Sequence, residues 1–304
     1  LDQKGWVDLA KSEEEMINVI LKASESGSVI FPLSLIHHAE TCKISNVKRR
    51  RKLASLMVTL SKGYSFSPYV ESIIEMEIRQ EVRIRYGLPP IDLGKHVFGK
   101  GIGHFIGAIP EIVSRKDAPE LPNQIRQELL DLLDSPEALY TVLAGYRKIP
   151  SLIQRLDVEA TKRMESIREE RLKIKDSKLR RRVELARFLR DIIAQKLAKV
   201  LIEMNLPKDT IIRKGWSERD FKEFLNNIPT ALCLFTLTLE GDQQLKRPIP
   251  VNDIYDIWAL SLAIPYSDIV VTEKMWTSIS RQSKLNEACN TIVVPSIDEL
   301  LKYL

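Results

Sequence analysis

Apolar and polar positions at the start of the chain follow first a helical and then a strand pattern. Residues 6–26 carry apolar side chains at helical spacing, and Gly27 ends this pattern. Residues 28–32 form a short apolar segment that predicts a buried strand, and a second helix follows it through Glu40. With Leu1 and Asp2 as the end of a first strand, the pattern predicts strand, helix, strand and helix within the first 44 residues.

The end of the chain repeats this alternation. Residues 252–264 predict a helix, and residues 269–272 are β-branched, which is typical of strands buried in parallel sheets. A helix over 274–289 and a strand over 291–294 follow, and a capping box begins a closing helix at Ser296. The two ends together predict an α/β fold, in which helices flank one parallel, doubly wound sheet assembled from both termini.

The middle of the chain differs, because it shows helical periods and caps but few convincing strands. We therefore expect a platform made of residues 1–44 and 251–304, with a large, mostly α-helical insertion over 45–250. Residues 231–239 are apolar on every side, so periodicity leaves them open as a buried helix or a strand. Helices of the insertion are predicted over 47–60, 69–85, 123–133, 136–147, 156–205 and 217–225.

Charge is distributed unevenly over the 304 residues. The net charge is +5, but residues 155–199 hold 15 Lys and Arg against 8 Asp and Glu, so the rest of the chain carries −2. Such a segment is either a solvated helix face or a surface for a polyanion. No apolar stretch is long enough to span a bilayer, and three scattered cysteines support neither a disulfide framework nor a zinc ribbon. We expect a cytoplasmic protein with no membrane partner.

Five carboxylates fall where a parallel sheet gathers its functional groups. Asp2 follows the first strand, Glu40 lies in the helix after the second, Asp253 and Asp256 begin a helix one turn apart, and Glu273 follows the strand 269–272. Like charges this close disfavour ionisation, and a divalent cation removes the penalty. Mg²⁺ or Mn²⁺ prefers carboxylate oxygen and can activate water for phosphodiester cleavage. The sequence predicts a metal-dependent nuclease site.

The chain also resembles the PIN-like nucleases. The resemblance rests on residues 1–9, on 31–34 leading to Glu40, and on 252–260 continuing to 269–274, which together cover about 100 residues at the two ends. It implies strand cleavage and a metal held by Asp2, Glu40, Asp256 or Asp253, and Glu273. Two departures are that Lys274 stands near the position of the last acid of compact PIN domains, and that the insertion of about 200 residues is far larger than theirs.

Each carboxylate also has a plainer interpretation. Asp253 could cap its helix, Glu40 could be an exposed helix residue, and Glu273 could form a weak surface pair with Lys274. Their joint placement is what favours a metal site.

Basic runs are the candidates for contacts to a nucleic acid, either RNA or single-stranded DNA, with RNA favoured. The segment 93–110 holds five glycines and comes within one residue of a phosphate-binding P-loop, but Gly101 lacks the required hydroxyl, so a flexible connector is the competing interpretation. His37, His38 and Cys42 share a helix without a second ligand pair, so a soft-metal site is not predicted.

The alternative to an enzyme is a non-catalytic helical module that binds nucleic acid or protein. The candidate substrate-binding residues are Lys48, Arg49, Arg50, Arg51, Lys100, Arg180, Arg181 and Arg182.

Overall fold

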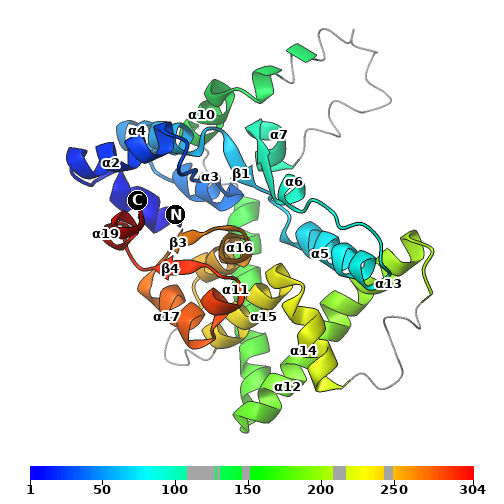
Figure 1. Ribbon diagram of the computed structural model, residues 1–304. Helices are drawn as coiled ribbons and strands as arrows, with labels where there is room; N and C mark the ends of the chain where they lie inside the picture. Colours follow the sequence, from blue (N-terminus) through cyan, green and yellow to red (C-terminus); the bar gives the residue numbers. More distant parts are fainter. Residues whose placement is uncertain (108–126, 129–130, 146–150, 208–216, 243–248) are drawn as a thin grey trace.

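The protein is dominated by helices (Figure 1). A computed structural model describes residues 1–107, 127–128, 131–145, 151–207, 217–242 and 249–304. The helices and strands of the first half are α1 (Gln3–Leu9), α2 (Glu14–Glu25), α3 (Leu35–Thr41), α4 (Val47–Ser61), β1 (Tyr64–Phe66), α5 (Val70–Arg85), α6 (Gly94–Val97), β2 (Phe98–Lys100), α7 (Gly101–Ile106) and α10 (Pro136–Ala144).

The second half consists mainly of helices of varied length, with two short strands near its end. Its elements are α11 (Ser151–Leu172), α12 (Ser177–Phe188), a π-helical turn η1 (Leu189–Ile193), α13 (Ala194–Glu203), α14 (Glu218–Asn226), α15 (Pro229–Asp242), α16 (Val251–Tyr266), β3 (Ile269–Val271), α17 (Lys274–Gln282), α18 (Leu285–Ala288), β4 (Ile292–Val294), α19 (Ile297–Leu300) and the 3₁₀ turn η3 (Leu301–Tyr303).

The prediction of a parallel, doubly wound PIN-like sheet is wrong. Within the described ranges the strands form two separate pairs: β1 with β2, antiparallel, and β3 with β4, parallel with Ile269 opposite Ile292. The strand expected over 28–32 does not form, and its neighbour Leu33 makes a single bridge to Ser65. Phe31 is buried and its N–H donates to the carbonyl of Leu60, but Pro32 has no N–H to donate and Ile30 is exposed, so the segment does not extend into a regular ladder.

The two chain ends nevertheless pack together (Figure 1). The backbone N–H of Asp2 donates to the carbonyl of Val271, 2.9 Å away, so the first residues lie along β3. One apolar core joins Trp6 and Leu9 of α1 to Val294 and Leu300 near the other end, and α4 buries side chains in the same core. The ends are therefore held by shared side-chain burial more than by a hydrogen-bonded sheet.

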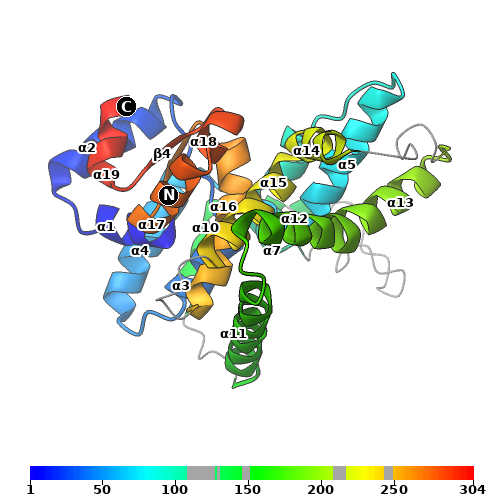
Figure 2. The same cartoon turned by 90° about the horizontal axis from the view of Figure 1, so that it is seen from below.

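Two further cores lie under the second half of the chain. One joins α15, α16 and α17 around Trp276, which is fully buried. The other joins α5 to α13, α14 and α15. Helix α15 contributes to both, because it is apolar on most sides, and this resolves residues 231–239 as a buried helix. Figure 2 shows α15 lying against α16.

The long helix expected over 156–205 is present but interrupted. A break at residues 173–176 separates α11 from α12, where Asp176 accepts hydrogen bonds from Lys178 N and Leu179 N and so begins a new helix. The predicted cap at Ser217 is confirmed by its hydrogen bonds with Asp220. Most of the helix predicted over 123–133 lies outside the described residues.

Candidate functional site

Asp2 sits at the N-terminus of α1, where its side chain caps the helix. Its Oδ1 accepts a hydrogen bond from Gly5 N at 2.6 Å. A Cβ on Gly5 would stand 3.2 Å from that oxygen, so glycine gives the carboxylate room to approach the helix. Burial raises the pKa of Asp2, while the Gly5 hydrogen bond and then the nearby Thr272 hydroxyl lower it.

Asp256 lies one turn after Asp253 on α16 and is the most strongly perturbed carboxylate of the group. Its Oδ2 accepts a hydrogen bond from Trp276 Nε1 at 3.1 Å. Burial raises the pKa of Asp256 to about 7, and repulsion from Asp2 and Glu40 adds to this against the lowering effect of the Trp276 hydrogen bond. A carboxyl that titrates near neutral pH can either exchange a proton or accept a metal ion.

Glu40 and Glu273 complete the cluster from two other elements. Glu40 lies in the last turn of α3, and Glu273 is the residue before α17. Burial raises the pKa of Glu40, Lys43 lowers it, and the charges of Asp2 and Glu273 raise it. The structure thus brings together, within electrostatic reach, four of the five carboxylates that the sequence singles out: Asp2, Glu40, Asp256 and Glu273, which we name the acidic cluster.

The acidic cluster is not a closed metal cage. Across the described ranges, no three His, Cys, Asp or Glu side chains are arranged so that they could hold a metal ion together. Its donor chemistry fits Mg²⁺, which keeps several waters and is commonly held by one or two carboxylates. A cavity of about 670 Å³ lies beside Asp2 and Asp256 and gives such an ion and its waters room.

An unpartnered hydroxyl supports a polar ligand at this place. Thr272 is only 2% exposed, and its Oγ1 has no partner with hydrogen-bond geometry, although it lies close enough to Asp2 to lower the pKa of that carboxyl. Buried polar groups are normally hydrogen-bonded, so an orphan beside carboxylates marks a place for water or a hydrated ion.

Three residues at the cluster were not singled out from the sequence. Trp276 holds Asp256, Thr272 lies next to Asp2, and Lys43 stands with its Nζ 5.4 Å from the ring centre of Tyr255 while its charge acts on Glu40. A tryptophan one turn after Glu273 on the buried face of a short helix is the signal that could have identified Trp276, because a buried indole N–H needs an acceptor. Asp253 is half-buried, and its place among the ligands stays a prediction.

The basic run on α4 is divided between surface and interior. Lys48, Arg49 and Arg51 are exposed. Arg50 is buried, and it donates from Nε to the carbonyl of Ala144 at 2.7 Å and from Nη1 to the carbonyl of Ile44. Arg50 therefore fastens α4 to the end of α10, and its guanidinium is used inside the protein.

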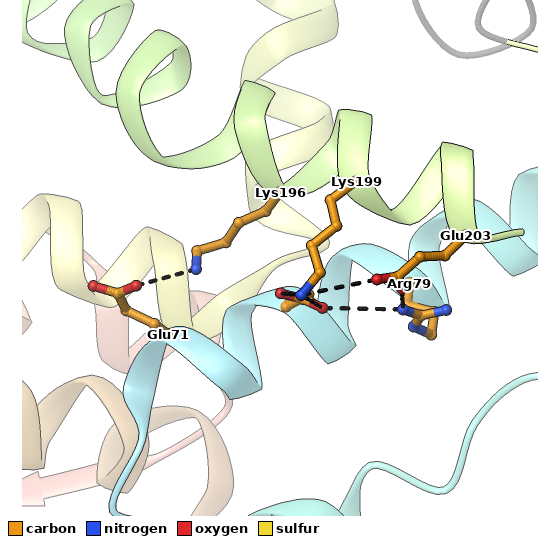
Figure 3. A network of polar contacts seen from close by, with 6 residues as sticks. Glu71, Arg79, Lys196, Lys199 and Glu203 are labelled. Carbon is orange, nitrogen blue, oxygen red and sulfur yellow. Dashed lines mark hydrogen bonds and ion pairs between the residues drawn. The ribbon is translucent and has the colours of Figure 1, made fainter.

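Much of the positive charge over 155–199 is used in ion pairs within the protein. Figure 3 shows Lys196 and Lys199 of α13 reaching across to acidic side chains of α5. Arg171, mostly buried, binds both Glu184 and Asp242 and so joins α11, α12 and α15. For the cations in these pairs, the structure favours a structural role between helices over binding of a polyanion.

The three arginines predicted on α12 have different surroundings. Arg181 pairs with Glu240 at 2.5 Å, and Arg180, half-buried, donates to the carbonyl of Ile174 at 3.2 Å. Arg182 is exposed. Lys100, also exposed, lies with Nζ 4.6 Å from the ring centre of Tyr64 on the neighbouring strand.

The described part of the glycine-rich segment is a packing feature. A Cβ on Gly99 would meet the His104 ring at 2.4 Å, and Gly101 has a φ of +78° with Asp134 against it. The near P-loop motif therefore lies on a β-strand and a short helix rather than on a phosphate-binding loop. His37 is buried against Trp6, and burial lowers its pKa to about 3, so it stays neutral.

Comparisons with family models, curated proteins and solved structures return no match to this chain. In the described parts of the chain, no helix has the length and apolar character needed to cross a membrane.

Proposed function

We propose that this chain is a divalent-metal-dependent nuclease that hydrolyses phosphodiester bonds. The observation that carries the proposal is the acidic cluster, in which Asp2, Glu40, Asp256 and Glu273 come from four separate elements. The charges of Asp2 and Glu273 raise the pKa of Glu40, and those of Asp2, Glu40 and Glu273 raise the pKa of Asp256. Nothing in packing alone calls for four such carboxylates in one place, since their mutual repulsion destabilises the fold. The proposal relies on the resemblance to PIN-like nucleases only for the order of these four carboxylates along the chain. It does not rely on the expected parallel sheet.

Each carboxylate has a role in this proposal. When bound, Mg²⁺ or Mn²⁺ supplies charge neutralisation and a more acidic water. Asp2, oriented by Gly5 N–H, and Asp256, oriented by Trp276 Nε1, hold the ion or its waters, and the Trp276 bond leaves Asp256 Oδ1 to bind the ion or take up a proton. Glu40 and Glu273, whose charges reach Asp256, would add negative charge and accept hydrogen bonds from the waters of the ion. Lys43, exposed beside Glu40, is suited to a phosphate oxygen.

The substrate in this proposal is a single strand, and we favour RNA over single-stranded DNA. Exposed cations on α4 lie on a helix that shares its core with α1, the helix that Asp2 begins. Such cations are suited to the phosphates of a bound strand. A cytoplasmic location remains a prediction from the sequence.

A cleavage assay tests the proposal. Labelled single-stranded RNA and DNA are incubated with the parent and with Asp2→Asn, Glu40→Gln, Asp256→Asn and Glu273→Gln variants, in Mn²⁺, in Mg²⁺ and in EDTA. We expect cleavage that needs the metal and falls about 100-fold or more in the Asp2 and Asp256 variants. Asp8→Asn is the matched control, because Asp8 lies on α1 as well but forms an exposed pair with Lys4, and it should cut like the parent.

Metal binding is measured separately by thermal unfolding. A metal that binds only the folded state raises the melting temperature, so Mn²⁺ should stabilise the parent more than the Asp256→Asn variant. Equal shifts in both would remove Asp256 from the ligand set, and the absence of any shift together with the absence of cleavage would refute the nuclease.

The open arrangement of the cluster favours one alternative. Because the described side chains form no ready metal cage, a helical module that binds nucleic acid or protein without cutting it is the second candidate. It predicts retained nucleic-acid or protein binding with no metal-dependent cleavage, and binding that the Asp256→Asn change leaves unaltered.

A further inference from the structure

Two cysteines that are 56 residues apart in the chain lie side by side. Cys233 is in the middle of α15, and Cys289 is the residue that ends α18. Their sulfur atoms are 3.8 Å apart, and both thiols are free. Cys42, the third cysteine, lies at the end of α3 and donates to the carbonyl of Ala39.

The two thiols differ in their surroundings. Cys233 is fully buried in the core around Trp276, whereas Cys289 is half-buried next to the turn at Asn290, whose φ of 53° ends the helix. A hydrogen bond from Cys233 lowers the pKa of Cys289, while the same contact and burial raise the pKa of Cys233. Cys289 is therefore the accessible sulfur that ionises first, and Cys233 is the protected partner behind it.

We propose that Cys233 and Cys289 form a peroxide-sensitive dithiol site that closes to a disulfide and ties α15 to the turn between α18 and β4. The Cys289 thiolate attacks one oxygen of hydrogen peroxide, which breaks the O–O bond, leaves a sulfenic acid on Cys289 and releases hydroxide that is protonated to water. The Cys233 sulfur then attacks Cys289 Sγ, the S–O bond breaks, and the hydroxyl group leaves as a second water with the Cys233 proton. Two thiols and one peroxide thus give one disulfide and two waters.

The geometry makes this step a short one. A disulfide requires its sulfurs at about 2.05 Å, and the two sulfurs are already in contact at 3.8 Å, so they must approach by about 1.8 Å. Sequence spacing alone did not reveal the pair, because the two cysteines come from separate predicted elements.

Peptide mapping of the intact chain tests the proposal. The reduced protein is treated with one equivalent of hydrogen peroxide, its remaining thiols are blocked with an alkylating reagent, and it is digested with trypsin without reduction. We expect a cross-linked species that joins the peptides containing Cys233 and Cys289, two hydrogens lighter than their sum, with Cys42 alkylated. Recovery of both cysteines as separate alkylated or overoxidised peptides, or of cross-links to Cys42, would overturn the proposal.

Thermal unfolding gives a second readout that does not depend on mass spectrometry. Oxidation should raise the melting temperature of the parent and of Cys42→Ala, because the cross-link restricts the unfolded chain. It should leave Cys289→Ala unshifted, and in that variant Cys233 should remain alkylatable after unfolding. An equal shift in Cys289→Ala would show that the stabilisation does not come from this disulfide.

Discussion

Buried carboxyl groups are the features that most clearly combine stability with chemistry in this protein. Glu77 on α5 is 1% exposed and accepts hydrogen bonds from Thr230 N at 3.1 Å, from Thr230 Oγ1 at 2.6 Å and from Tyr266 Oη at 2.7 Å. Thr230 is the second residue of α15, so Glu77 satisfies a backbone N–H that the helix leaves open. Burial raises the pKa of Glu77 to about 7 despite these hydrogen bonds.

The first prediction concerns Glu77→Gln. Because the folded-state pKa of Glu77 lies above its ordinary value of 4.5, the folded protein holds a proton that the unfolded chain releases. The stabilising contribution is complete below pH 4.5 and is lost as the pH rises through about 7. Relative to the variant, the parent should lose up to about 3 kcal/mol of unfolding free energy between pH 5 and pH 8, measured by urea denaturation.

The matched control is Glu75→Gln on the same helix. Glu75 pairs with Lys199 nearer the surface, so its removal should leave the slope of stability against pH close to that of the parent. Parallel curves for the parent and Glu77→Gln would show that Glu77 does not change its protonation in this range.

Asp256 shows why a single residue of this kind can be predicted from the sequence only in part. Its position at the start of a helix beside an expected strand was enough to make it a candidate. Its partner Trp276 and the raised pKa depend on burial in the core between α15, α16 and α17, which no spacing reveals. Sequence patterns place the carboxylate, and tertiary packing determines its chemistry.

At the scale of elements, the basic run on α4 contains both a buried structural arginine, Arg50, and exposed cations. Arg50 lies between exposed Arg49 and Arg51 on α4, yet it donates to the carbonyls of Ala144 and Ile44. Ala144 is the last residue of α10, where a cation also interacts favourably with the helix dipole. The contact between α4 and α10 is therefore held by a charged hydrogen bond as well as by apolar packing.

Replacing Arg50 with Met should consequently destabilise the fold. The change leaves two carbonyls without their donor, at a cost of about 1 to 3 kcal/mol of unfolding free energy. Arg49→Met and Arg51→Met, on the exposed face, should each change it by less than about 0.5 kcal/mol. Chemical denaturation of the three variants checks this, and similar losses in all of them would contradict the structural role of Arg50.

Helices were easier to predict than strands for a physical reason. A period of 3.6 over many residues identifies α4, α5 and α16 from local sequence, and each forms within two residues of its expected start. The strands β3 and β4 were identified from β-branched runs, but β1 and β2 were not. A strand needs a partner, and pairing such as that of Ser65 with Gly99 is not encoded in either segment alone.

At the scale of the whole molecule, the ends of the chain meet as expected although the sheet does not form. Short apolar segments such as 269–271 can bury their side chains among helices. Apolar segments at both ends of the chain can therefore bring the two ends together without a continuous hydrogen-bonded sheet. The same proximity assembles the acidic cluster. The proximity of four of the five carboxylates was therefore predictable from their order along the chain, whereas the fold class inferred with it was wrong, and their role as metal ligands stays a prediction.

Charge is also organised at this scale, into two separate basic regions. Figures 1 and 2 both place α4 and α12 apart, so one short strand of nucleic acid is not expected to contact both. Two cations of α12 form ion pairs within the protein, Arg181 with Glu240 and Arg187 with Glu184. Lys48, Arg49 and Arg51 of α4 are exposed. Helix α4 also follows α3, which carries Glu40, so it is the region closer in the chain to the acidic cluster.

The final prediction assigns nucleic-acid binding to α4. Affinity for a single-stranded RNA is measured by fluorescence anisotropy in EDTA over a range of salt concentrations, so that no strand is cut. Replacing Lys48, Arg49 and Arg51 with Gln in one triple variant should weaken binding and reduce the slope of log affinity against log salt by about 2, since each lost phosphate contact on a single strand contributes about 0.7.

The matched triple change of Lys178, Arg181 and Arg182 to Gln removes the same charge from α12 and should leave the slope nearly unchanged. A loss confined to the α12 variant would move the binding surface to that helix, and equal slopes in all three proteins would show that neither run contacts the RNA.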